Sequence, residues 1–548
     1  MMKKVMKKAL PIGIDSFREI RETNRYYVDK TLLIRDFISA FDKVALITRP
    51  RRFGKTLNLT MLREFFDITK NSKAIFEGLK IMDTEYAAQI NSRPVIYITF
   101  KDCRANTIES LVFKMSTAIL VEYEKYSAIF KAGINESKVC YQTFQTIYSK
   151  LIERDISLDF LEIAVQTLEQ ALFEYYKIMP MVFIDEYDQP IMSSFEFDYH
   201  KQLSTFFAGF YGSALKGQDC LHQALLTGIQ RIVKESIFSQ LNSIMVYTVV
   251  DKYYSTHFGL LPEEADELLS CYNLHLDNVV KQKYNGYIFG EVEIYNPWSI
   301  LYYANTGELK NYWVNTSTNF LIRKSIDEAD SLFRKSFDRL ICDGYANVSA
   351  DLECSFIELK HSDTLWGLLI NSGYITVVEK INEMSMNVRI PNGEVQSEFM
   401  KIIAAQANVQ SLDLNKMFRN LFERNMDAFM DIYSEIVLSC TSYYDAKENA
   451  YHMMFLGMCI ALNGIYKISS NVEAGYGRSD IVMESLYSDR PHIVIEFKQG
   501  EEINELKETA LRQILDNRYY GSLRGEILCI GIAHNKKKCL MAHKTINM

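Results

Sequence analysis

The 548-residue sequence has no long hydrophobic run. No apolar segment approaches the roughly 20 residues that a helix needs to cross a bilayer. The basic start, residues 1–8, leads into a short segment broken by Pro11 and Gly13, which does not match the apolar core of a secretory signal. We therefore expect a cytoplasmic protein that makes no use of a membrane.

Paired metal-binding cysteines are also missing. The ten cysteines include no Cys-x-x-Cys pair and no histidine partners at zinc-site spacing, so no structural zinc site is predicted. Reduced, buried thiols are typical of a cytoplasmic protein. The length exceeds what one hydrophobic core can organise and predicts three to four domains.

Negative charge is scarce at the N-terminal end, although the net charge is −8. Residues 1–60 contain 14 Lys and Arg against 6 Asp and Glu, an excess of +8. Such a segment suits contact with a triphosphate or with nucleic acid, while a solvated surface is the simpler explanation of any charge excess.

A phosphate-binding loop is indicated near this basic end. The apolar run 44–47 stops at a basic loop, and Gly54-Lys55-Thr56 then opens a helical pattern. In a P-loop, backbone N–H groups cradle phosphates, the lysine reaches the β- and γ-phosphates, and the threonine hydroxyl coordinates Mg²⁺. The loop is atypical because Arg49 stands where the first glycine is expected, and Arg51 and Arg52 follow. A bare Gly-Lys-Thr also arises by chance, so the interpretation depends on the strand before it and the helix after it.

A second apolar strand, 179–185, ends in Asp185-Glu186. A buried parallel strand delivers such residues to the carboxyl edge of an α/β sheet. There Asp185 can hold the Mg²⁺ bound by Thr56, and Glu186 can orient the attacking water. An apolar run followed by acids otherwise means only the end of a strand.

A third apolar strand, 224–228, places Thr227 at the same edge. Thr227 is a candidate sensor of the γ-phosphate, and Arg231, one helical turn later, is a candidate to reach it. The alternative is that Thr227 is a helix N-cap and Arg231 is solvated. Residues 257–345 are predicted to form a helical lid with aromatic turns, and the short helix and strand signals of 351–400 suggest a small winged-helix-like module.

The C-terminal end carries a second set of chemical residues. A helical pattern over 445–462 contains Glu448, the predicted strand 480–483 begins with Asp480, and the strand 492–498 contains Glu496 and Lys498. Alternation along a strand puts Glu496 and Lys498 on one face. Two carboxylates on neighbouring strands suit Mg²⁺, and the lysine can act on water or on the attacked phosphate. The alternative is an exposed surface pair of little energetic weight.

These motifs resemble two known families. The sequences 49–56 (Arg-Pro-Arg-Arg-Phe-Gly-Lys-Thr), Phe183–Asp188, Leu226–Gly228, Tyr284–Tyr287 and Asn296–Ser299 resemble the predicted AAA-ATPase-like family of bacterial P-loop proteins. An arginine at the position of Arg49 is common in that family. The segment from Glu448 to Tyr520 resembles the PD-(D/E)XK nuclease superfamily domain that usually follows such ATPases, with Ser479 in place of the motif's proline.

The resemblance implies a fold and a set of site residues. The expected fold is α/β: an AAA-like P-loop NTPase with a parallel sheet and a helical lid (1–345), a winged-helix-like or helical linker module (346–410), and a restriction-endonuclease-like nuclease domain (411–548). ATP would bind at Arg51, Arg52, Gly54, Lys55, Thr56, Asp185, Thr227 and Arg231. Asp480, Glu496 and Lys498 match the nuclease core, Glu448 the helical acid and Gln513 the trailing glutamine.

Two functions are compatible with these residues. The first is an ATP-hydrolysing protein coupled to a Mg²⁺-dependent nuclease, with nucleic acid as partner, DNA favoured over RNA, and a homo-oligomer as a further possibility. The second is a regulatory NTPase of the signalling type, whose C-terminal domain binds nucleic acid or protein without cleaving it. The acid and lysine positions of the nuclease motif are all filled, which favours the first function.

Overall fold

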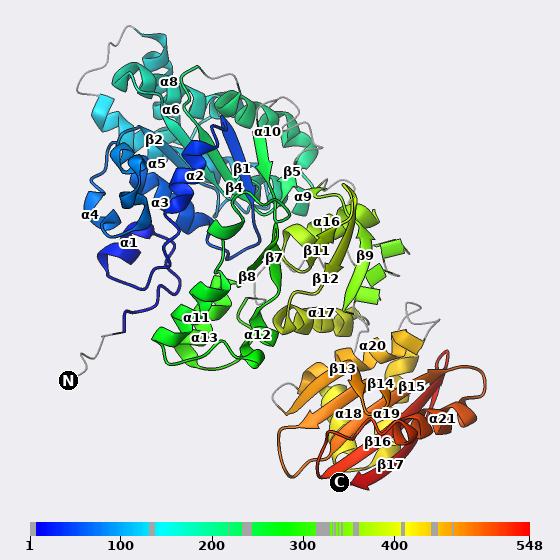
Figure 1. Ribbon diagram of the computed structural model, residues 1–548. Helices are drawn as coiled ribbons and strands as arrows, with labels where there is room; N and C mark the ends of the chain where they lie inside the picture. The colour runs from blue at the N-terminus through cyan, green and yellow to red at the C-terminus, as the bar shows by residue number, and fades with distance from the viewer. Residues whose placement is uncertain are drawn as a thin grey trace, which may run out of the picture. The chain divides into compact units, whose positions relative to one another are not determined.

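The computed structural model describes residues 7–130, 138–216, 219–232, 244–313, parts of 329–340, 344–354, 361–406, 411–439, 448–462 and 465–548. Within these ranges, no helix is both long and apolar enough to cross a membrane. The chain divides into two compact units, Met1–Phe333 with Val348–Asn392, and Arg334–Asn347 with Gly393–Met548 (Figure 1). The domain bounds 1–345, 346–410 and 411–548 stay predictions.

The first unit is built on a five-stranded parallel sheet in the order β2-β3-β4-β1-β6 (Figure 1). Every residue of β1, β3 and β4 is buried, as expected for strands covered on both faces. The strands are β1 (Val44–Thr48), β2 (Val95–Thr99), β3 (Met181–Asp185), β4 (Ala224–Gly228) and β6 (Ile244–Tyr247). The mixed α/β fold with a P-loop-like parallel sheet is therefore confirmed.

Helices lie between these strands in the chain. Residues 158–176 form two helices that divide at Ile163. The elements are α1 (Phe17–Glu22), α2 (Leu32–Ser39), α3 (Lys55–Phe66), α4 (Lys73–Phe76), η1 (Lys80–Asp83), η2 (Glu85–Gln89), α5 (Ile108–Phe130), α6 (Val139–Glu153), α7 (Leu158–Glu162), α8 (Ala164–Tyr176), α9 (Gln189–Glu196) and α10 (His200–Leu215).

Arg49, which follows β1, is completely buried. Its guanidinium lies over the rings of Phe258 and Phe289, at 5.3 Å from each centroid. Burial lowers the pKa of this guanidinium to about 9. Its Nη1 donates hydrogen bonds of 2.8–3.1 Å to three backbone carbonyl oxygens, those of Thr48, Tyr247 and Thr248. Arg49 therefore joins the end of β1 to the end of β6 and to the segment that precedes α11.

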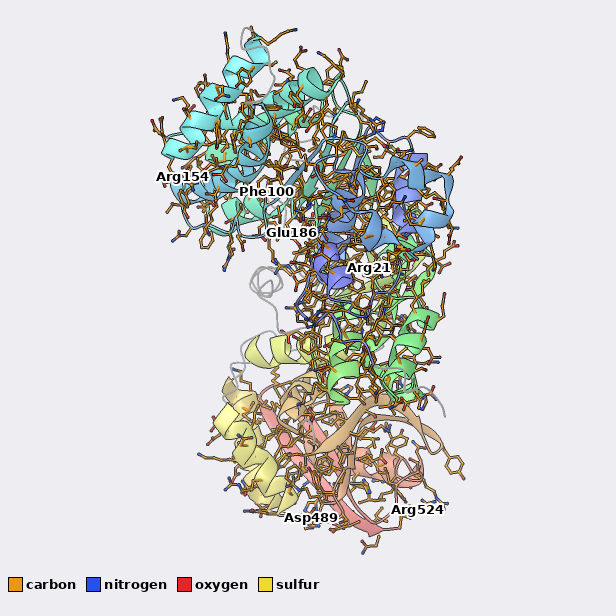
Figure 2. The ribbon with its side chains drawn as sticks, turned by 90° about the vertical axis from the view of Figure 1, so that its left-hand side faces the viewer. Arg21, Phe100, Arg154, Glu186, Asp489 and Arg524 are labelled. Carbon is orange, nitrogen blue, oxygen red and sulfur yellow. The ribbon has the colours of Figure 1, made fainter. Side chains whose placement is uncertain are left out.

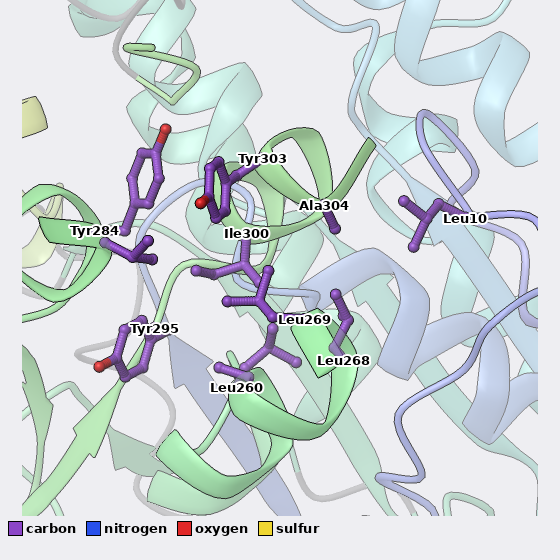
Figure 3. Close-up of a cluster of buried hydrophobic side chains, with 11 residues drawn as sticks. Leu10, Leu260, Leu268, Leu269, Tyr284, Tyr295, Ile300, Tyr303 and Ala304 are labelled. Atoms are coloured by element: carbon purple, nitrogen blue, oxygen red, sulfur yellow. The ribbon is translucent and has the colours of Figure 1, made fainter. Parts of the chain in front are cut away.

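In the described part of the predicted lid, three helices pack around a hydrophobic core that also includes Leu10 of the N-terminal segment. They are α11 (Pro262–Cys271), α12 (Asn278–Tyr284) and α13 (Pro297–Thr306), with η3 (Ser255–His257), β7 (Tyr287–Phe289) and β8 (Val292–Ile294) beside them in the chain. Figure 3 shows how Leu260, Leu269 and Ile300 pack together with tyrosine rings at the edge of the cluster. The turn between α12 and β7 requires glycine, because a Cβ on Gly286 (φ +110°) would lie 1.8 Å from the carbonyl oxygen of Pro391.

The winged-helix-like module is not confirmed. The elements of this region are β9 (Tyr345–Ser349), β10 (Glu353–Cys354), α16 (Ser362–Asn371), β11 (Thr376–Lys380), β12 (Ser385–Arg389) and α17 (Gly393–Gln406). β11 and β12 form an antiparallel pair, while β10 pairs in parallel with β5 (Arg231–Ile232). Residues 348–392 belong to the first compact unit and α17 to the second, so the elements of 346–410 are divided between the two units.

The second unit contains a five-stranded mixed sheet in the order β13-β14-β15-β16-β17 (Figure 1). β15 and β16 are parallel, and α21 connects them. A Cβ on Gly531 would lie 2.5 Å from the backbone of α21, so glycine permits the close approach of helix and sheet. The elements are α18 (Ser411–Phe422), α19 (Met426–Ser439), α20 (Glu448–Met458), η6 (Cys459–Leu462), β13 (Tyr466–Ala474), β14 (Gly477–Ser485), β15 (His492–Gln499), α21 (Ile503–Asp516), β16 (Glu526–Asn535) and β17 (Lys538–Asn547).

His534 is a fully buried titratable group of this sheet. Its ring stacks on Tyr451 with centroids 3.9 Å apart, and its Nε2 is 2.9 Å from the hydroxyl of Tyr433. Burial disfavours the charged imidazolium and lowers the pKa of His534 to about 3. The folded unit therefore holds this histidine neutral at pH values where the unfolded chain protonates it.

We expect Arg49→Ala to lower the free energy of unfolding by about 2 kcal/mol or more, because hydrogen bonds and packing are lost in a buried site. Denaturant unfolding of the full chain measures this. The matched control is Arg35→Ala, since Arg35 is 44 % exposed and pairs with the adjacent Asp36. Its effect should stay below about 1 kcal/mol. Equal effects of the two changes would contradict the role of Arg49.

Acid should destabilise the second unit through His534. Its folded pKa lies below the unfolded value of 6.5, so its contribution to stability is complete above pH 6.5 and is lost as pH falls toward 3. Lowering the pH from about 7 to about 5 should remove about 2 kcal/mol, measured by denaturant unfolding. His534→Gln should reduce this pH dependence, whereas His275→Gln, at an exposed position, should leave it unchanged.

Candidate functional sites

The loop after β1 arches over the start of α3. Gly54 (φ +87°) is the N-cap of α3, a left-handed conformation that glycine adopts without strain. The Nζ of Lys55 donates to the carbonyl oxygens of Arg49 (3.0 Å) and Pro50 (3.1 Å) and lies 3.8 Å from Oε1 of Glu186. The lysine thus points into the arch that its own loop forms, where a phosphate group would be cradled.

Asp185 is brought to this loop by the sheet register. Its Oδ2 accepts a 2.7 Å hydrogen bond from Oγ1 of Thr56, and its Oδ1 accepts a 2.8 Å hydrogen bond from Oγ1 of Thr227. Burial and the charge of Glu186 raise the pKa of Asp185 to about 6, because both disfavour a second negative charge at this point. Three strand ends therefore converge on one buried carboxylate.

Glu186 turns toward the cavity rather than into the sheet. Its backbone is left-handed (φ +52°), which is uncommon for a residue with a side chain. Its side chain is 18 % exposed, unlike that of Asp185, which is completely buried. Figure 2 shows Glu186 in the first unit. The two adjacent acids thus have separate positions, one inside the protein and one at the cavity wall.

A cavity of about 600 Å³ opens above these residues. Its walls come from the P-loop with the start of α3, from the N-terminal segment 11–15, from the ends of β2 and β3, and from α13. The loop guanidinium of Arg52 lies 3.5 Å above the ring of Trp298, and both line the cavity. Basic residues on the wall are Arg51, Arg52, Lys55, Lys101 and Arg104. Lys101 and Arg104 pair with the acids Asp15 and Glu196 of the same wall. The volume and the basic side chains of the P-loop suit a nucleoside triphosphate.

The structure corrects two expectations about the third strand. Thr227 is neither a helix N-cap nor part of the cavity wall; it is fully buried and orients Asp185. Arg231 does not lie one helical turn later, because β5 rather than a helix follows β4. Its guanidinium pairs with Glu353 at 2.8 Å, away from the cavity lining.

Sequence reasoning assigned no role to Asp188. This residue is fully buried, and its Oδ2 accepts hydrogen bonds from the backbone N–H groups of Ile229 (2.8 Å) and Gln230 (2.9 Å). It therefore holds the turn after β4 beside Asp185. Trp298 and Lys101 also line the cavity without having been assigned. No local pattern in the sequence distinguishes such residues from ordinary surface or core positions.

In the second unit, Glu496 is the centre of a polar cluster. Its side chain is only 3 % exposed, yet it lies on β15 among apolar neighbours. Oε1 accepts hydrogen bonds from Lys498 Nζ (3.1 Å) and Gln513 Nε2 (2.5 Å). Burial and the charge of Asp480 raise the pKa of Glu496 to about 7. An exposed surface pair is therefore the wrong description of Glu496 and Lys498.

Asp480 joins the cluster from the neighbouring strand. Its backbone N–H donates to Oε2 of Glu496 at 3.3 Å, and its Oδ2 accepts a 2.7 Å hydrogen bond from the backbone N–H of Phe497. The predicted adjacency of Asp480, Glu496 and Lys498 is present. Glu448 begins α20, but its side chain lies outside the described residues.

Tyr519 holds the glutamine of this cluster. Its hydroxyl accepts hydrogen bonds from Gln513 Nε2 (3.1 Å) and Asn517 Nδ2 (3.0 Å), and its ring is buried. Among the side chains that the structure describes, no group of three or more His, Cys, Asp and Glu forms a ready-made metal site. The oxygen ligands available here are those of Asp480 and Glu496, which match the hard donors that Mg²⁺ and Mn²⁺ accept.

Comparisons with known proteins agree with this division of the chain. A curated protein of Azotobacter chroococcum mcd 1, named "Uncharacterized protein in vnfD 5'region", is 27 % identical over 399 residues, which cover 71 % of this chain and 69 % of that protein. Residues 11–238 match the family described as predicted AAA-ATPase, and residues 446–544 match the PD-(D/E)XK nuclease superfamily. The chain thus carries a predicted AAA-ATPase-like domain over residues 11–238 and a PD-(D/E)XK nuclease superfamily domain over residues 446–544.

Proposed function

We propose that the first unit binds ATP with Mg²⁺ and hydrolyses it, and that the second unit cleaves phosphodiester bonds of nucleic acid with a divalent cation. One observation carries the proposal: each unit buries a carboxylate, Asp185 at the end of β3 or Glu496 within β15, near a lysine and a second acid. Uncompensated burial of such groups is unfavourable. A cation and a phosphate would offset that penalty.

In the ATPase site, the chain's own groups have separable tasks. The backbone N–H groups at the start of α3 and the Nζ of Lys55 would bind the phosphates. Thr56 and Asp185 offer the hydroxyl and carboxylate oxygens that Mg²⁺ prefers, and Thr227 keeps Asp185 in place. Glu186, at the cavity wall, would orient the attacking water. Arg51 and Arg52 would add charge-assisted contacts to the triphosphate.

In the nuclease site, Asp480 and Glu496 would ligate the cation, with Glu448 in support. A bound divalent cation would neutralise charge that develops on the phosphate oxygens. Lys498 would act on the water or on the scissile phosphate, and Gln513 orients Glu496 through its 2.5 Å hydrogen bond. The proposed partners are nucleic acid, DNA first, and further copies of this chain in a homo-oligomer.

For the ATPase, Lys55→Ala should abolish ATP binding, because the cation that faces the phosphates is removed. Glu186→Gln should keep binding but reduce turnover by at least about 100-fold, since the water loses its base. Calorimetric titration and phosphate release measure the two effects. Lys73→Ala, at an exposed position on α4, is the control. Unchanged hydrolysis in both site variants would overturn the assignment.

For the nuclease, Asp480→Ala and Lys498→Ala should each remove Mg²⁺- or Mn²⁺-dependent cleavage of labelled DNA and RNA while the chain stays folded. Lys544→Ala, an exposed lysine of β17, should cleave like the wild type. Circular dichroism confirms folding, and gel electrophoresis follows cleavage with and without ATP. Wild-type cleavage that persists in Asp480→Ala would end the claim. Binding without any cleavage would favour the regulatory alternative.

A further inference from the structure

The turn between β13 and β14 presents an aromatic ring to solvent next to the nuclease cluster. Tyr476 is 79 % exposed, whereas Tyr519, on which the turn packs, is 2 % exposed. Resting on the proposed nuclease function, we propose that this turn, Gly475–Arg478, binds single-stranded nucleic acid, with Tyr476 stacking on an unpaired base.

The backbone of the turn is clamped to the end of α21. The N–H of Tyr476 donates to the carbonyl oxygen of Asn517 at 2.8 Å. A Cβ on Gly475 (φ +58°) would lie 2.0 Å from that same oxygen, so only glycine permits this approach. Gly477 lies against the ring of Tyr519. A Cβ added to Gly477 would be 3.1 Å from the nearest atoms of that side chain. The exposed ring therefore stands on a fixed backbone, which lowers the entropy lost when a ligand binds.

A chain of hydrogen bonds connects this turn to the catalytic cluster. Asn517, which accepts from the turn, donates through its side chain to the hydroxyl of Tyr519. Gln513 donates both to that hydroxyl and to Glu496. A base stacked on Tyr476 would therefore be held at a set position relative to the carboxylates.

Charge around the turn matches a phosphate backbone. Arg478 is exposed and stands two residues before Asp480, and Arg518, also exposed, follows the residue that clamps the turn. An aromatic face flanked by guanidinium groups binds single strands by stacking and phosphate contact. In a duplex, the faces of paired bases are already stacked and unavailable to a tyrosine. The occupant is therefore a single strand or a frayed end.

The test measures binding of a fluorescein-labelled single-stranded DNA oligonucleotide by fluorescence anisotropy, in EDTA so that no cleavage occurs. Parallel titrations use the RNA of the same sequence and a blunt DNA duplex. Tyr476→Ala should weaken single-strand binding by about 5- to 100-fold, the range expected from the loss of one stacked base. Tyr476→Phe keeps the ring and should bind like the wild type.

Tyr487→Ala is the matched control, because Tyr487 is 54 % exposed and lies beyond the other end of the nine-residue β14. It should bind single strands as the wild type does. Unchanged affinity in Tyr476→Ala, an equal loss in Tyr487→Ala, or an equal loss for the duplex would overturn the inference. If single-strand binding depends on Tyr476 but the protein never cleaves nucleic acid, the proposed nuclease function is wrong and the proposed binding by the turn is supported.

Discussion

The unfavourable burial of negative charge is the physical constraint on which both sites depend. Asp185 is fully buried between two threonine hydroxyls, and Glu496 is buried between a lysine and a glutamine. In each case desolvation and a neighbouring acid raise the pKa of the carboxyl group. A bound cation would offset this unfavourable burial, and for that reason we propose metal-assisted phosphate chemistry at both sites.

The loop from Arg49 to Phe53 explains how an atypical P-loop keeps its shape. Arg49 is anchored to β6 and to aromatic rings near the lid, and Arg52 stacks on Trp298. Phe53 packs on Tyr287 with centroids 5.0 Å apart, and its carbonyl oxygen accepts from Gly259. The bulky side chains of the loop thus fix its conformation through contacts with residues 249–313. The conformation of this loop therefore depends on contacts with the segment that contains η3, β7 and α13.

The two sites use their second acid differently. Glu186 has a strained backbone that turns it outward, which leaves it available to water in the cavity. Asp480 is instead held by the backbone N–H of Phe497 and faces Glu496 across paired strands. In the first unit the two acids are therefore apart, one buried and one at the cavity wall, whereas in the second unit the two acids lie side by side.

Much of the fold and both clusters were predictable from local pattern. Apolar runs that end in polar residues predict buried parallel strands, so Thr56 with Asp185 could be paired in advance because the ends of parallel strands meet at one edge. Asp480 and Glu496 could be paired as carboxylates on neighbouring strands, and those strands, β14 and β15, are antiparallel. The position of Arg231 could not be predicted, because the sequence after β4 does not reveal that a second short strand, β5, replaces the expected helix. The arrangement of residues 346–410, where a winged-helix-like module was expected, could not be predicted either. The elements of this region are divided between the two compact units.

The amino-acid sequence by itself determined which chemistry is available: a lysine and a threonine after one strand, and acids on three others. Hydrophobic periodicity is a property of neighbouring residues, so it can be recognised in the sequence without a structure. Only the tertiary structure decided that Thr227 serves Asp185, that Asp188 holds the adjacent turn, and that Tyr519 joins Gln513 to the β13–β14 turn. These contacts depend on packing between segments that are many residues apart, and no local pattern in the sequence shows which of those segments come together.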